Sequence, residues 1–196
     1  MKITALVFVI LCINVSVFGQ SDLDKIILNK EGVVDENWIE KIQGDIEWEY
    51  IKTVGVKGKK ISSVVSTPVG KTWRFNKSSV KVLPYMWKSS EGEYSDLDAK
   101  FHLSNRIIVI ETVVDLGKGR TSNSKAAYEV INLTNEFLVL EEIDDKYCFD
   151  FVNGRKLTKE DCKEKRAKEP ERLFGGSSIN IGGKSPKKRL VFKKVN

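Results

Sequence analysis

The stretch from residue 126 to 143, AAYEVINLTNEFLVLEEI, constrains the fold more than any other part of the chain. Two short runs rich in β-branched and aromatic residues flank the polar residues Thr134, Asn135 and Glu136, so the stretch predicts an antiparallel β-hairpin. An isolated hairpin is only marginally stable in water, because its apolar face needs other elements to cover it. We therefore expect the rest of the chain to supply further strands.

Similar short runs, each followed by turn residues, precede this hairpin with no convincing helix between them. They predict six more strands, at residues 46–51, 60–66, 72–76, 80–87, 100–103 and 106–114. Consecutive strands joined by short turns favour an antiparallel meander, and closure into a barrel removes the exposed edge strands. The predicted fold is mainly β, an antiparallel up-and-down β-barrel of about eight strands with short N-terminal helices and a basic C-terminal extension.

The N-terminus has the pattern of a secretory signal. Residues 1–19 carry one lysine, an apolar run from Ile3 to Ile13 and a small residue at Gly19, where we expect cleavage. The run is short and poorly flanked for a stable membrane span, and no other run in the chain approaches the length of one. The mature protein is therefore expected to be exported, to the periplasm or the extracellular space, without a transmembrane segment.

Residues 20–43 form a predicted N-terminal helical segment. Helices are expected at 22–30 and 35–42, the second with Asp35 as its N-cap and with Trp38, Ile39 and Ile42 on one face. Such an apolar face needs a partner, so we expect this segment to act as a lid or plug on the barrel.

The barrel domain is predicted over residues 44–154, with a ninth strand at Tyr147, Phe149 and Phe151, and the basic extension over 155–196. The whole chain has a formal net charge of +6, but the extension alone holds 14 Lys and Arg against 5 Asp and Glu. It predicts a polar helix at 158–168 and an edge strand at 189–195. The sequence leaves open whether this charge contacts an anionic surface or only keeps the protein soluble.

Cys148 and Cys162 are the two cysteines left after signal cleavage. In an exported chain two cysteines at this spacing can close a short loop, with about 3 kcal/mol of stabilisation from loop entropy. The spacing does not decide between a disulfide and two free thiols.

Three segments together resemble a known family. TWRFNKSSVKV, FHLSNRIIVI and YEVINLTNEFLVLEE resemble the small lipocalin-like (calycin-type) barrels of exported bacterial proteins, over about residues 44–143. The matching positions are Trp73, Phe75, Asn76, Phe101, Leu103, Tyr128, Val130, Leu133, Thr134, Leu138 and Leu140. The resemblance implies a barrel fold and carries no catalytic site. Gly44 and Trp48 stand further apart than the Gly-x-Trp motif of true lipocalins.

Catalytic and metal-binding patterns are weak. His102 is the only histidine, and it lies between Phe101 and Leu103, which we expect to point inward, so His102 should face solvent. Two cysteines and one histidine do not complete a zinc site, and no calcium loop is present. We expect a protein that is not an enzyme and has no cofactor.

Six aromatic residues are the candidate lining of an interior ligand site, because they combine large apolar faces with polar handles. They are Trp48, Tyr50, Trp73, Phe75, Trp87 and Tyr128. An eight-stranded barrel has room either for one small, partly apolar ligand or for its own side chains. Two functions stay open: a secreted barrel that binds such a ligand, and a solid barrel whose basic extension contacts an anionic surface or a protein. No specific nucleic-acid partner is indicated, and the oligomeric state is open.

Overall fold

The computed structural model describes residues 22–28, 36–64, 70–83, 93–115, 119, 121–143, 148–168 and 186–195. The predicted signal sequence and the candidate residue Trp87 lie outside these residues.

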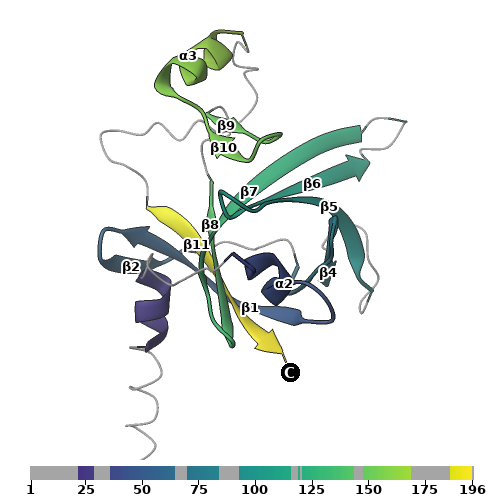
Figure 1. The fold of residues 1–196 in the computed structure, drawn as a ribbon, viewed down its shortest axis with the longest axis vertical. Helices are drawn as coiled ribbons and strands as arrows, with labels where there is room; N and C mark the ends of the chain where they lie inside the picture. Colours follow the sequence, from purple (N-terminus) through teal and green to yellow (C-terminus); the bar gives the residue numbers. More distant parts are fainter. Residues whose placement is uncertain are drawn as a thin grey trace, which may run out of the picture.

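The described chain is built mainly of strands, with a few short helices (Figure 1). A helical segment covers 22–28. The elements that follow are α2 (Trp38–Ile42), β1 (Glu47–Lys57), β2 (Lys60–Ser63), β3 (Thr72–Phe75), β4 (Ser79–Leu83), β5 (Ser95–His102), β6 (Ile107–Asp115), β7 (Thr121–Leu133), β8 (Phe137–Glu142), β9 (Phe149–Asp150), β10 (Arg155–Lys156), α3 (Lys159–Lys168) and β11 (Lys187–Val195). None of the helices in the described part of the chain has the length and apolar character to cross a bilayer.

Eight of these strands close into an antiparallel barrel, which confirms the predicted fold class. The order is β11-β8-β7-β6-β5-β4-β3-β1, and β11 also pairs with β1. The prediction of an edge strand at 189–195 was therefore wrong. β11 has a partner on both sides, with Leu190 opposite Leu140 of β8 and Thr53 of β1, so this part of the predicted extension belongs to the barrel wall.

The predicted second strand is a side arm and not a barrel strand. β1 is long enough to pair with β3 at Trp48 and Glu49 and then with β2 from Val54 to Lys57, along the same edge. β2 therefore extends the wall beyond β3. The barrel still has eight strands because β11 closes it.

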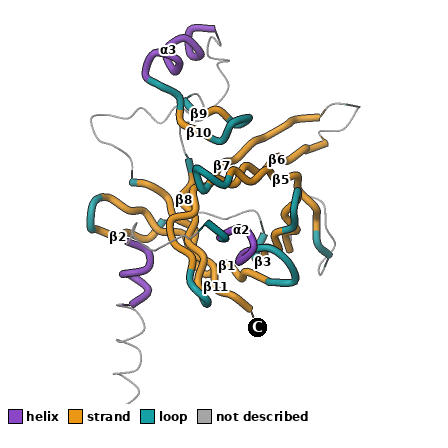
Figure 2. The backbone as a smooth tube through the Cα atoms, in the orientation of Figure 1, coloured by secondary structure: helices purple, strands orange, loops and turns teal. Residues whose placement is uncertain are grey.

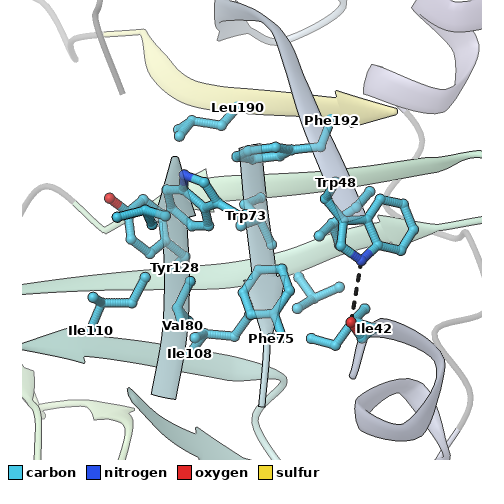
Figure 3. Close-up of a cluster of buried hydrophobic side chains, with 14 of the residues drawn as sticks. Ile42, Trp48, Trp73, Phe75, Val80, Ile108, Ile110, Tyr128, Leu190 and Phe192 are labelled. Carbon is cyan, nitrogen blue, oxygen red and sulfur yellow. Dashed lines mark hydrogen bonds between the residues drawn. The ribbon is translucent and has the colours of Figure 1, made fainter. Parts of the chain in front are cut away.

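The barrel interior is filled from inward-facing residues of every barrel strand, as alternation along a strand requires. Figure 3 shows the inner cluster, with Trp73, Tyr128 and Phe192 gathered at its centre. The buried members are Trp38, Ile42, Trp48, Trp73, Phe75, Val80, Val82, Leu97, Ile108, Ile110, Tyr128, Val130, Leu138, Leu140, Leu190 and Phe192.

α2 closes one end of the barrel, as predicted for a plug, whereas the 22–28 helix, predicted as part of the same plug, packs on the outer wall. α2 is shorter than predicted, but Trp38 and Ile42 are buried in the inner cluster, and Figure 2 shows α2 within the ring of strands. The Trp48 indole donates to the Ile42 carbonyl at 3.2 Å, and the Trp38 indole donates to Leu103 at 3.4 Å. We call this the α2 end. β4, β6 and β8 run away from it, so Leu83, Asp115 and Glu142 mark the far end.

Two apolar patches on the outer wall have their own covers. Ile27 of the 22–28 helix is fully buried against Val54, Val56 and Val191. On the other side, the run Ile107 to Ile110 is buried on both faces, because Ile107 and Val109 point outward beneath Phe149 while Ile108 and Ile110 point inward. A strand buried on both faces favours such a continuous β-branched run.

Residues 148–168 form a small module outside the barrel, made of the β9–β10 hairpin and α3. Figure 1 shows α3 beside β9 and β10 and away from the barrel strands. The helix begins as predicted, since the Thr158 hydroxyl caps it by accepting from the Asp161 amide at 3.1 Å.

Candidate functional site

Five of the six predicted lining residues come together in the inner cluster. The Trp73 ring is central to them, with its centroid 5.9 Å from Phe75, 5.8 Å from Tyr128 and 4.9 Å from Phe192. Tyr50 reaches the same group through Phe192, at 5.9 Å. These are contact distances between aromatic rings, so no ligand space separates the residues.

The half of the interior next to α2 is therefore solid. Trp48 and Trp73 are 1% exposed and Phe75 is fully buried. At the packing density of protein interiors this leaves no room for a bound molecule. Trp48 and Phe75 serve as core, and a ligand site inside the barrel is confined to the far end.

The interior changes character toward that far end, where polar groups replace the aromatic ones. Tyr128 stands opposite Glu142 on β8, so both side chains lie on the inner face. Lys188 lies two residues before inward-facing Leu190 on β11, so it is on the same face of the strand. Its ammonium lies 3.6 Å from the Glu142 carboxylate. Thr112 and Ser124 are paired on β6 and β7 in the same alternation. We call Tyr128, Glu142, Lys188, Thr112, Ser124 and Thr53 the polar layer.

Tyr128 joins the solid half to the polar layer. It is 7% exposed and stands opposite Glu142 of β8. Figure 3 shows the hydroxyl pointing away from the end where Ile42 lies. Burial, and secondarily the Glu142 carboxylate, raise the pKa of Tyr128, so the phenol stays protonated and keeps its hydrogen to donate. A phenol in this position can donate a hydrogen bond to a ligand at the far end.

A cleft beside β1 is bordered by Thr53 of the polar layer. It encloses about 460 Å³ and is lined by Tyr50, Thr53, Lys52 and Ile61, among others. Its polar handle is the Tyr50 hydroxyl, which lies 2.9 Å from the Thr53 hydroxyl. The volume falls within the range of small-molecule sites. The opening exists because β1 leaves β3 after Glu49 and meets β2 only at Val54.

Sequence reasoning found Tyr128 but missed the other five residues of the polar layer. A search for aromatic residues does not find the threonines, the serine or the Lys188–Glu142 ion pair. The signal was present: the alternation that turns Tyr128 inward also turns Ser124 inward, and the alternation that turns Leu140 inward also turns Glu142 inward.

His102 does not face open solvent, contrary to prediction, because the β9–β10 hairpin covers it. A Cβ placed on Gly154 would lie 2.2 Å from the imidazole ring, so only a glycine fits there. Nε2 is buried and has no hydrogen-bond partner among the described residues. Burial, and then the Lys100 ammonium, lower the pKa of His102. His102 therefore packs against the β9–β10 hairpin where the hairpin meets the barrel.

Cys148 and Cys162, which the sequence left open, are joined by a disulfide with 4.8 Å between their Cα atoms. It ties α3 to the start of β9. Two side chains of the barrel hold the hairpin tip: Lys100 donates to the Val152 carbonyl at 2.7 Å and Asn105 to the Gly154 carbonyl at 3.0 Å.

Within the described ranges no group of three His, Cys, Asp or Glu side chains is placed to hold a metal ion. Comparison with known proteins gives no relative: no family model, no curated protein and no solved structure matches this chain.

Proposed function

We propose that the protein is an exported, non-catalytic, lipocalin-like barrel that binds one small, partly apolar molecule at the far end of its interior. The observation that carries this is Tyr128, which is 7% exposed, stands opposite Glu142 where the solid half ends, and keeps its hydroxyl hydrogen.

The geometry also indicates the chemistry of the ligand. Trp73 and Leu190 offer an apolar border on the solid side, and Tyr128, Glu142 and Lys188 offer two donors and an acceptor on the other. The ligand is therefore a molecule with an apolar body and a polar group that both donates and accepts hydrogen bonds.

Two features support export. The apolar N-terminal stretch predicts a cleaved signal, and the Cys148–Cys162 disulfide is a bond typical of oxidising compartments.

The lipocalin-like assignment is supported by the positions that carried the resemblance. Most of the apolar ones, including Trp73, Phe75, Val130, Leu138 and Leu140, are buried in the inner cluster and so determine the barrel core. Leu103 is the exception, since it lies in a turn and is 59% exposed.

A solid barrel that acts only through its surface is the second candidate, and the filled α2 half favours it. The two candidates differ in a titration of intrinsic fluorescence with fatty acids, sterols and haem. Binding at the far end changes the emission of Trp73, and most of the change is lost in Trp73→Phe but kept in Trp38→Phe at the α2 end. No spectral change with any of these probes would contradict the ligand-binding proposal.

A further inference from the structure

The polar helix α3 buries almost nothing, which is unusual for a helix fixed by a disulfide. Among its described side chains only Cys162 is buried. Helices in globular proteins are normally stabilised by an apolar face packed on a core, and α3 has no such face. Its contribution to the core does not explain why the chain holds it in place.

The attachment of α3 is nevertheless firm. The disulfide joins it to Cys148, and the Lys165 ammonium donates to the Phe149 carbonyl at 3.1 Å. Phe149 is itself fully buried on the outer wall of the barrel. The helix is thus held in a fixed position and presents its side chains to solvent, which is the arrangement of a contact surface.

Three exposed lysines on this module have no acidic partner among the residues described. They are Lys156 at the end of β10 and Lys159 and Lys163, four residues apart on one face of α3. We call them the lysine set. Of the acidic side chains nearby, Asp150 lies 3.9 Å from Arg155, and Glu160 and Asp161 lie in the first turn of α3 beside the helix N-terminus. Glu129 borders the same cleft as Arg155 and Lys156, and Glu164 is exposed on α3. Unpaired, like charges spaced along a rigid element attract an anionic partner.

We propose that the lysine set is a docking site for a linear acidic polysaccharide. A chain with repeated carboxylate or sulfate groups can contact several exposed ammonium groups in succession, and it needs no apolar contact. A lipid surface fits less well, because helices that lie on membranes insert apolar side chains, and α3 offers none. This proposal does not depend on a ligand in the barrel.

The test is the affinity of the full chain for heparin, used as the probe, by biolayer interferometry at about 50 and 200 mM NaCl. The variant Lys156→Gln/Lys159→Gln/Lys163→Gln removes the lysine set. The matched control Lys57→Gln/Lys59→Gln/Lys60→Gln removes three exposed lysines from the β1–β2 arm, so both variants have the same net charge. All six positions are on the surface, and circular dichroism checks that both variants fold.

We expect the first variant to raise Kd for heparin at least tenfold and to lower the slope of log Kd against log salt by about two, since counterion release scales with the charges neutralised. The control should stay within about twofold of wild type. Equal losses in both variants, unchanged affinity in the first, or no heparin binding at the lower salt overturns the proposal. Duplex DNA or phosphatidylglycerol vesicles bound as tightly as heparin, with the same loss in the first variant, overturns the assignment to a polysaccharide.

Discussion

Arg189 and Glu141 form a buried ion pair across β11 and β8, on the outer wall of the barrel. Nε and Nη2 of Arg189 both donate to Oε2 of Glu141, at 3.0 and 2.9 Å, and the two side chains are 2% and 5% exposed. Nη1 of Arg189 also donates to the Ile27 carbonyl. One arginine therefore fastens the closing strand to its neighbour and to the N-terminal helix.

Breaking this pair should be strongly destabilising. Arg189→Met leaves the Glu141 carboxylate buried with only Lys187 to balance it, and we expect a loss of about 3–5 kcal/mol in unfolding free energy. Guanidinium denaturation measures it. Glu111→Gln breaks a surface pair with Lys125, at 3.0 Å, and should cost less than about 1 kcal/mol. Similar losses in the two variants would mean that Arg189 is not a closing contact.

Removal of β11 should abolish the fold. Ending the chain at Pro186 exposes the ladders of both β1 and β8 and removes Leu190 and Phe192 from the core. The truncated protein should lose its near-ultraviolet circular dichroism. An intact tertiary signal would show that the segment is dispensable, as an edge strand would be.

Gly154→Ala should release the β9–β10 hairpin. Gly154 has φ +59°, which alone disfavours alanine, and the added Cβ would also strike His102. Gly58→Ala is the matched control, because Gly58 has φ +62° and nothing within 4 Å of the new Cβ. We expect tryptic cleavage at the α3 lysines to accelerate in Gly154→Ala only, as mass spectrometry would show. Equal acceleration in both variants would show that contact with His102 does not hold the hairpin in place.

Docking of the hairpin should weaken as the pH falls. The pKa of His102 is lowered in the folded state, so below its ordinary value of about 6.5 the released state binds a proton that the docked state does not. Stability from this contact is complete above that pH and declines below it. Lys100 faces the ring and opposes its protonation, while Asp150 favours it. The melting temperature should fall more between pH 7 and pH 5 in wild type than in His102→Gln, and equal falls would contradict this.

The sequence predicted the barrel because its strands alternate regularly and are joined by short turns, both of which are local signals. It missed the closing role of β11, since Lys187 and Arg189 indicate an exposed strand until Glu141, far away in sequence, is placed opposite them. The β1–β2 arm was misjudged for a similar reason: only the pairing of Trp48 with Trp73 shows where β3 meets β1. The aromatic residues of the site could be predicted from their residue type. Glu142 and Lys188 could not, because only the strand register shows that they lie on the inner face.

The most direct test of ligand binding at the far end is isothermal titration of Tyr128→Phe and Tyr94→Phe with the tightest ligand found in the fluorescence titration. Tyr128 offers its hydroxyl to the interior, whereas the Tyr94 hydroxyl donates to Glu47 on the outer wall at 2.7 Å. Loss of one hydrogen bond to the ligand should raise Kd about 3- to 10-fold in Tyr128→Phe and leave Tyr94→Phe unchanged. Equal affinities in wild type and both variants would contradict a ligand site at Tyr128.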